Sequence, residues 1–158
     1  MTLEIRAILG EDEEEILWVA VRMRLTLMEV LGNEVGEALY SMDWLDRRVR
    51  YHLDPLKCLG QIFLCVLPDG RRLGYTIVRR EEPTLGLFST TYVDPEWRRR
   101  GVARLLVSQG ELWMRGLGLA QSVTYTSETN RGLHALYQTF GYELIPGESG
   151  FVKLIKAL

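Results

Sequence analysis

The stretch from residue 85 to residue 113 joins a strand-like run to a helix-like run through a turn that holds three consecutive arginines. Residues 85–93 are mostly apolar and end at an Asp-Pro pair, and the apolar positions of residues 102–113 follow helical spacing. Arg98 to Arg100 stand directly before this helix, where positive charge opposes the positive end of the helix dipole. A purely structural helix start would favour Asp, Glu or Ser. The arrangement therefore predicts that an anion binds at the turn.

The residues after the arginines are small enough to let an anion approach the backbone. Gly101 has no Cβ and can adopt unusual dihedrals, and Ala103 is also small. The first N–H groups of a helix have no partner within it, and a guanidinium group can donate two hydrogen bonds to a phosphate. A solvated basic turn would explain the charge, but not the succession of strand, Asp-Pro, arginines, Gly-x-Ala and helix. We therefore expect a phosphate or pyrophosphate site here.

The composition of the chain restricts its class. With 158 residues it can bury one core, so we expect residues 1–158 to form a single domain. The net charge of −2 argues against a nucleic-acid binder. We predict no metal, because the cysteines and histidines are too few for a closed zinc site: Cys58, Cys65, His52 and His134. The N-terminus does not resemble a signal peptide and no apolar run reaches transmembrane length, so we expect a cytoplasmic protein without a membrane partner.

The period of the hydrophobic pattern predicts the order of secondary-structure elements. Strands are expected at residues 3–7, 61–67, 73–78, 85–93, 122–126, 143–145 and 151–155. Helices are expected from residue 12 onward and at residues 41–53, 102–116 and 130–140. The second helix is expected to turn Trp44, Leu45 and Val49 inward. The acidic residues at the start of the first helix are expected to compensate its dipole; the alternative is that they form a wall for a cationic substrate.

The connections between these elements predict a mixed sheet. Asp69-Gly70 between two strand-like runs indicates a hairpin, so the central strands are antiparallel. The strand–helix–strand unit that begins at residue 85 instead requires a right-handed parallel crossover. We therefore expect an α/β (α+β) fold with a mixed, mostly antiparallel sheet, one parallel β-α-β crossover and helices on both faces. Ligands in such sheets bind beyond the carboxyl ends of parallel strands, where the arginine turn lies.

Two blocks of sequence resemble a known family. Residues 93–103, VDPEWRRRGVA, are similar to the acyl-coenzyme A signature Arg/Gln-x-x-Gly-x-Gly/Ala of the GNAT superfamily of N-acetyltransferases. Residues 130–142, NRGLHALYQTFGY, resemble the later Asn…Tyr…Gly block of that family at its usual spacing. The order of elements resembles the GNAT fold over nearly the whole chain. A P-loop, a dinucleotide-binding fingerprint in the right context and a Gly-x-Ser-x-Gly elbow are absent from the sequence.

The resemblance implies that the turn binds acetyl-coenzyme A. It assigns contacts with the cofactor to Thr91, Tyr92, Val93, Arg98, Arg99, Arg100, Gly101, Val102, Ala103 and Asn130. It also implies a catalytic role for Tyr137, as the proton donor to the departing thiolate. From the pattern alone, Tyr137 fits a core tyrosine and Asn130 fits a plain helix cap. Seven residues separate the two, so we expect both side chains on one face of the helix.

The sequence departs from the family pattern at the general base. Many members carry a glutamate on or near the strand before the turn, but residues 85–93, LGLFSTTYV, contain no carboxylate. Four candidates stay open: Glu81 or Glu82, Ser89, Tyr92, or a chain of water molecules. An amine that arrives neutral would need no dedicated base.

Two functional hypotheses follow. The first is an N-acetyltransferase that moves an acetyl group from acetyl-coenzyme A to a primary amine, on a small molecule or a peptide, by direct attack in a ternary complex. The alternative is a non-catalytic acyl-coenzyme A-binding or sensory module. The expected acceptor segments, residues 25–41 and 145–151, mix apolar and acidic side chains, which suggests a cationic amine with an apolar body. The protein would act as a monomer or a homodimer.

Overall fold

A computed structural model of the chain describes residues 2–31 and 40–158 and confirms the expected order of elements. The side chains of residues 29–31 lie outside the described part. The strands are β1 (Glu4–Ala7), β2 (Gly60–Val66), β3 (Arg72–Glu82), β4 (Leu85–Val93), β5 (Gln121–Ser127), β6 (Glu143–Pro146) and β7 (Phe151–Ala157). The helices are α1 (Glu13–Leu31), α3 (Met42–Leu53), the short 3-10 helix η1 (Pro95–Trp97), α4 (Val102–Gly116) and α5 (Arg131–Thr139).

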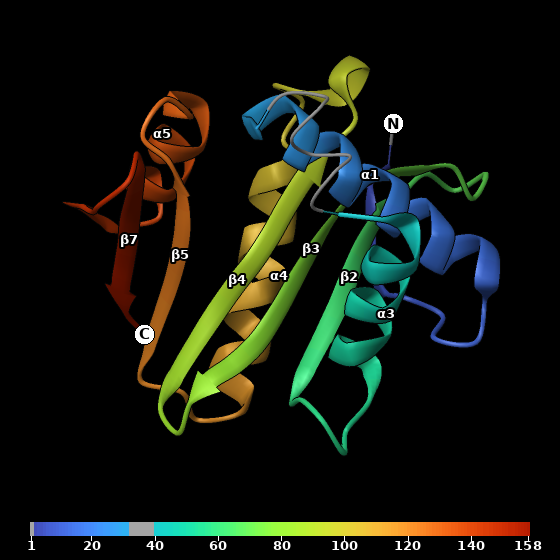
Figure 1. Ribbon diagram of the computed structural model, residues 1–158, viewed down its shortest axis with the longest axis horizontal. Coiled ribbons are helices and arrows are strands. Elements are labelled where there is room, and N and C mark those ends of the chain that lie inside the picture. Colours follow the sequence, from blue (N-terminus) through green and yellow to red (C-terminus); the bar gives the residue numbers. More distant parts are fainter. Residues whose placement is uncertain (1, 32–39) are drawn as a thin grey trace.

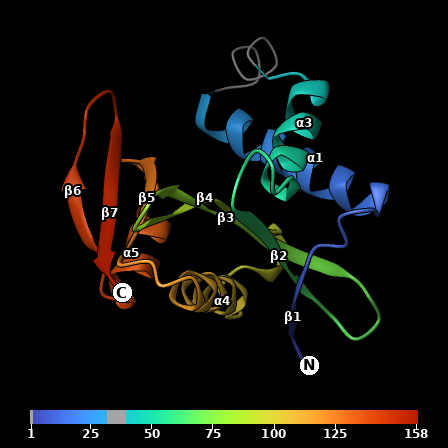
Figure 2. The same cartoon turned by 90° about the horizontal axis from the view of Figure 1, so that it is seen from below.

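The strands form one mixed sheet, as the sequence predicts. Their order is β1-β2-β3-β4-β5-β7-β6, and β4 with β5 is the parallel pair among otherwise antiparallel described strands. Figures 1 and 2 show α1 and α3 over one face of the sheet, with α4 and α5 on the other. The helix α4 provides the crossover that returns the chain from β4 to β5.

Two apolar cores hold the helices on the sheet. On one face, Ile16 and Val19 of α1 and Leu45 and Val49 of α3 are buried together against the strands. On the other face, buried side chains of α4 pack on Phe88 of β4 in a second cluster. Burying such side chains stabilises a fold by roughly 1.5–3 kcal/mol each, so both helical layers fix the position of the strand ends.

A bulge in β4 opens the sheet at its parallel pair. Thr90 lies opposite Ile77 and Phe88 lies opposite Val78, which leaves Ser89 as an extra residue of β4 between two registered pairs. The pairing with β5 covers only Leu85 to Phe88, before the bulge. Beyond it β4 and β5 diverge (Figure 1). The last residues of β4 keep their pairing with β3 but offer backbone groups on the other edge.

One local expectation was wrong and another was incomplete. Trp44 does not point inward: 37% of its surface is exposed, and it packs on Tyr40 with ring centroids 4.9 Å apart. The acidic start of α1 also does more than offset the dipole, because Glu15 is fully buried. Its carboxylate accepts hydrogen bonds from Arg6 at 2.6 and 2.7 Å and from Arg72 at 2.9 Å. This network ties α1 to two strands.

Candidate active site

A groove of about 640 Å³ lies between the open edge of β4 and the starts of α4 and α5. It brings together all the predicted cofactor-binding residues except Arg100: Thr91, Tyr92, Val93, Arg98, Arg99, Gly101, Val102, Ala103 and Asn130. Sequence reasoning missed further lining residues on three helices, among them Thr26, Arg104, Leu136 and Thr139. No carboxylate stands among the described lining residues, so the groove suits an anionic ligand.

The turn before α4 has the backbone conformation that an anion site needs. Gly101 is the N-cap residue, with a left-handed φ of 85°, and it has no side chain to bond the first N–H groups of the helix. Space around its Cα is open, since a Cβ there would meet no heavy atom within 4 Å among the described residues. Arg99 is also left-handed, with φ 63°. An anion can therefore reach the helix start directly.

The three arginines of the turn point to different places. The Nε of Arg98 donates to the carbonyl oxygen of Val93 at 3.0 Å, which folds the turn back on the end of β4. Arg99 lines the groove. Arg100 does not: its guanidinium lies 4.9 Å from the ring centroid of Trp97 and lines an adjoining cavity. Arg98 and Arg99 therefore line the groove, whereas Arg100 lines the adjoining cavity, which shares Gly101 with the groove.

Asn130 caps α5 and lines the groove at the same time. Its Oδ1 accepts from the backbone N–H of Leu133 at 3.3 Å, and its Nδ2 donates to Thr126 Oγ1 at 3.4 Å. The side chain is therefore held in place by the helix and by β5 while it faces the groove. The structural role and a ligand contact are compatible.

Tyr137 is fully buried and does not line the groove. Its hydroxyl lies 3.4 Å from Thr91 Oγ1, and Thr91 Oγ1 lies 2.8 Å from Thr76 Oγ1. Burial raises the pKa of Tyr137 above its ordinary value, although hydrogen bonding with Thr91 and Thr124 acts in the opposite direction. The phenol therefore stays protonated, and it reaches the groove through the hydroxyl of Thr91.

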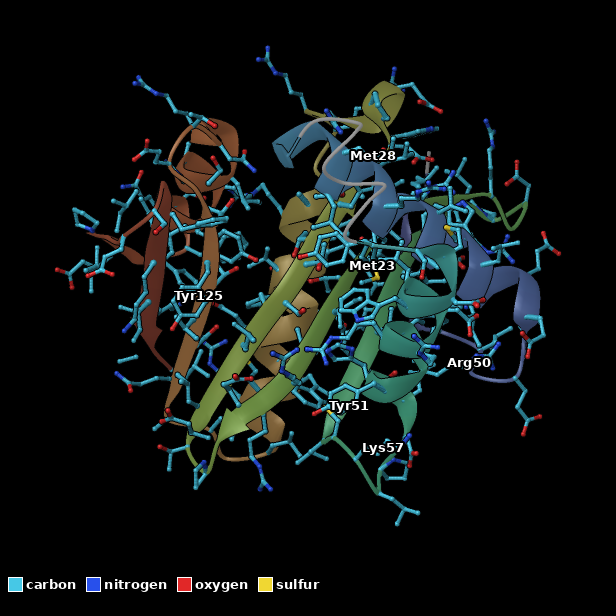
Figure 3. The ribbon with its side chains drawn as sticks, in the orientation of Figure 1. Met23, Met28, Arg50, Tyr51, Lys57 and Tyr125 are labelled. Carbon is cyan, nitrogen blue, oxygen red and sulfur yellow. The ribbon has the colours of Figure 1, made fainter. Side chains whose placement is uncertain are left out.

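A second cavity of about 630 Å³ meets the groove at Tyr92, which lines both. Leu25 and Met28 of α1 form its apolar wall, and Figure 3 labels Met28 at this end of the helix. Asp94 and Glu96 form its acidic wall. The Asp94 carboxylate accepts from Arg22 Nε at 2.9 Å. Arg22 lines the cavity as well, so the second cavity combines apolar side chains with an ion pair and the carboxylate of Glu96.

The structure separates two of the suggested bases from the site. Glu81 and Glu82 line another cavity with Tyr51 and Lys57, at the end of the sheet opposite Met28 (Figure 3). They are too remote to receive a proton in the groove, so this suggestion was wrong. Within the acceptor segments named above, Leu25 and Met28 line the second cavity, whereas residues 32–39 lie outside the described part of the chain.

Among residues 2–31 and 40–158, no group of three or more His, Cys, Asp or Glu side chains is placed to hold a metal ion. In the same residues no helix combines the length and apolar character that crossing a membrane requires. Cys58 and Cys65 are both free thiols.

The splayed mixed sheet, with the arginine turn at the end of β4, defines the class of acyl-coenzyme A N-acyltransferase folds. Residues 32–142 match the acetyltransferase (GNAT) family, and the chain belongs to this family. An N-acetyltransferase from Thermoplasma acidophilum, described as PaiA and solved with coenzyme A, superimposes with a TM-score of 0.79 over 100% of both chains at 16% identity. An acetyltransferase from Streptococcus agalactiae gives 0.72 over 99% of this chain and 98% of that one, at 18% identity.

Similarity to proteins of known activity is more limited. An aminoglycoside N(6')-acetyltransferase type 1 from Stenotrophomonas maltophilia is 27% identical over 92 residues, covering 53% of this chain and 60% of the relative. A mycothiol acetyltransferase from Thermobifida fusca is 38% identical over 52 residues, which cover 33% of this chain and 16% of the relative. The chain therefore spans less than two thirds of both relatives.

Proposed function

We propose that the protein transfers an acetyl group from acetyl-coenzyme A to a primary amine by direct attack in a ternary complex. The groove is the observation that carries this proposal. It joins the edge of β4 that is not paired with β5 to the start of α4, where no side chain caps the helix and Gly101 leaves the backbone open. A strand edge suits the amide-bearing pantetheine arm, and the helix start suits the pyrophosphate. Membership of the acetyltransferase family supports the acetyl group as cargo.

The second cavity is the proposed place of the acceptor amine. It adjoins the groove at Tyr92, which brings an amine there close to a thioester at the end of β4. Arg22 also lines this cavity and offsets the charge of Asp94, so the carboxylate of Glu96 beside Leu25 and Met28 favours a cationic amine with an apolar body. The aminoglycoside N(6')-acetyltransferase among the relatives acts, by its name, on an amine of an aminoglycoside, which supports an amine as the acceptor.

Tyr137 is proposed to stabilise the leaving thiolate as a hydrogen-bond donor, through Thr91. In the reaction the amine, in its neutral form, bonds through nitrogen to the thioester carbon and releases a proton to solvent, while the carbon–sulfur bond breaks and sulfur keeps the electron pair. A buried phenol with a raised pKa is a weaker acid than an alkyl thiol, whose pKa lies near 8.5 in cysteine. Complete proton transfer from Tyr137 is therefore unfavourable, whereas a hydrogen bond relayed by Thr91 Oγ1 is not.

The test is turnover by the Tyr137→Phe variant, followed as thiol release with acetyl-coenzyme A and a panel of cationic, neutral and acidic amines. We expect kcat to fall by roughly 10²-fold, with the affinity for coenzyme A little changed. Tyr142→Phe is the matched control, because it removes another buried hydroxyl, bonded to Ser122 Oγ at 2.7 Å, away from Thr91. Equal kcat losses in the two variants would refute the role of Tyr137.

The same panel separates the enzyme from the alternative, a non-catalytic acyl-coenzyme A-binding module. Absence of turnover with every amine, together with intact binding of coenzyme A, would favour the module. Faster turnover of acidic amines than of cationic ones would contradict the acceptor class. Glu96→Gln should raise KM for the cationic amines selectively, since it removes one negative charge from the second cavity.

A further inference from the structure

A cavity on the far side of the arginine turn adjoins the groove and was not predicted from the sequence. We call it the side cavity; it has a volume of about 420 Å³ and is lined by Arg100, Gly101, Arg104, Leu105, Ser108 and Phe140. It shares Gly101 and Arg104 with the groove, so the two spaces meet at the start of α4. A ligand whose anionic centre lies at Gly101 can therefore extend into both.

The side cavity is basic and contains no carboxylate among its lining residues. Arg104 donates from Nη1 to Thr139 Oγ1 at 3.0 Å, and its guanidinium lies 5.1 Å from the ring centroid of Phe140. Arg100 lies over the ring of Trp97. Both guanidinium groups are thus placed by aromatic rings, and a guanidinium has five N–H donors, so each retains capacity for an anion. Ser108 adds a hydroxyl.

We propose that the side cavity binds the adenosine 3′-phosphate of acyl-coenzyme A, with Arg100 and Arg104 on the phosphate. The inference rests on the proposed use of acyl-coenzyme A. The molecule has two arms on either side of its pyrophosphate, and the open edge of β4 accounts for the pantetheine arm. The adenosine arm must leave Gly101 by another way. The side cavity provides apolar surface at Leu105 and Phe140 for the base and two arginines for the dianion.

The experiment compares coenzyme A with dephospho-coenzyme A, which lacks only the 3′-phosphate, by calorimetric titration of the purified protein. We expect dephospho-coenzyme A to bind about tenfold more weakly, as the loss of a charge-assisted contact predicts. Arg104→Met keeps the apolar stem and removes the guanidinium. Because Arg104 also lines the groove, binding of both ligands can weaken, but binding of coenzyme A should weaken about tenfold more than binding of dephospho-coenzyme A, so that the two ligands bind alike.

The matched control is Arg71→Met, which removes the same charge from the β2–β3 turn, where Arg71 pairs with Asp69 at 3.4 Å. It should preserve the discrimination between the two ligands. The proposal is overturned if the wild-type protein binds both ligands equally, or if Arg104→Met weakens both to the same extent. If coenzyme A does not bind at all, the proposed function fails as well, which is a distinct outcome from binding without discrimination.

Adenosine 3′,5′-bisphosphate provides a second measurement that does not depend on the pantetheine arm. It should compete with coenzyme A more strongly than adenosine 5′-monophosphate does, and Arg104→Met should abolish that difference. Competition of equal strength by the two nucleotides would contradict the subsite. Urea unfolding of Arg104→Met checks that the exposed substitution leaves the fold intact.

Discussion

At the scale of single residues, the backbone of the arginine turn is strained at Arg99. A left-handed conformation costs a residue other than glycine roughly 1–2 kcal/mol, and Arg99 adopts it at φ 63° beside a ligand groove. Gly101 adopts the same region at φ 85° without this cost. The turn therefore keeps an arginine where glycine would be more stable, which is consistent with a role in binding.

One substitution at each of these two positions tests this explanation. Arg99→Gly should leave the free energy of unfolding unchanged or raise it by up to about 1 kcal/mol, because relief of strain exceeds the added freedom of the unfolded chain. It should also weaken binding of coenzyme A. Gly101→Ala should lower stability by about 1 kcal/mol, since the open space around Gly101 leaves backbone strain as the cost. Urea unfolding measures the free energy of unfolding of both variants. A larger loss of stability in Arg99→Gly than in Gly101→Ala would contradict the explanation.

At the scale of elements, the position of α4 depends on a close approach to β4. A Cβ on Gly110 would lie 2.2 Å from Phe88 Cε1 and 3.2 Å from Val78 Cγ1, and both of these side chains are buried. Gly110→Ala should therefore lower the free energy of unfolding by roughly 1–3 kcal/mol through overpacking. The matched control is Gly116→Ala at the end of the same helix, where the added methyl group meets no heavy atom of the described residues within 4 Å.

The control should raise stability by roughly 0.5–1 kcal/mol, because alanine is the better helix former. Thermal or urea unfolding of the two variants gives the comparison. A gain in stability for Gly110→Ala would mean that α4 moves freely on the sheet. The helix start at Gly101 would then not be held at a fixed distance from β4.

Sequence reasoning predicted the elements well and their irregularities poorly. The strand at 85–93 and the helix that follows were expected at their observed positions, because periodicity and glycine punctuation are local signals. The extension of β3 from Val78 to Glu82 was missed, since its polar residues pair in a hairpin that leaves them exposed. The bulge at Ser89 was also missed, because the serine carries no signal and the partner strand sets the register.

At the scale of the whole molecule, the same limit applies to the site. The resemblance to the acetyltransferases pointed to the turn, and helical spacing predicted Asn130 and Tyr137 on one face of the helix. Spacing gives direction but not depth: Asn130 lies at the mouth of the groove, whereas Tyr137, two turns later, is covered by Phe88 and Tyr142. The second cavity depends on contacts between α1 and the end of β4, such as the pair of Arg22 with Asp94, and these are too distant in sequence to predict.

The stability of the molecule in acid should depend on His52, which lies far from the groove. His52 is buried where α3 packs on β3; its Nδ1 donates to the carbonyl oxygen of Arg48 at 2.9 Å, and its Nε2 accepts from Arg79 at 2.9 Å. Burial lowers its pKa from 6.5 to about 4, and the positive charges of Arg79 and Arg48 act in the same direction. The folded protein therefore holds His52 neutral.

The sign of the effect follows from this lowered pKa. Between pH 6.5 and about pH 4 the unfolded chain binds a proton at His52 that the folded chain does not, so stability falls as the pH falls through this window. Above pH 6.5 the contribution of neutral His52 to stability is fully present. Glu15 adds a loss at lower pH: burial raises its pKa, but hydrogen bonds from Arg6, Leu9 and Arg72 lower it to about 2, from 4.5.

Replacing His52 by glutamine separates the two contributions. Glutamine can still donate and accept hydrogen bonds but does not titrate, so the variant should lose less stability than the wild type between about pH 7.5 and about pH 5. The difference should be on the order of 2 kcal/mol, measured by urea unfolding at the two pH values. Equal losses in the two proteins would show that His52 accepts a proton while the chain stays folded. The contact of His52 on α3 with Arg79 on β3 would then break in acid while the rest of the fold, including the groove, stays folded.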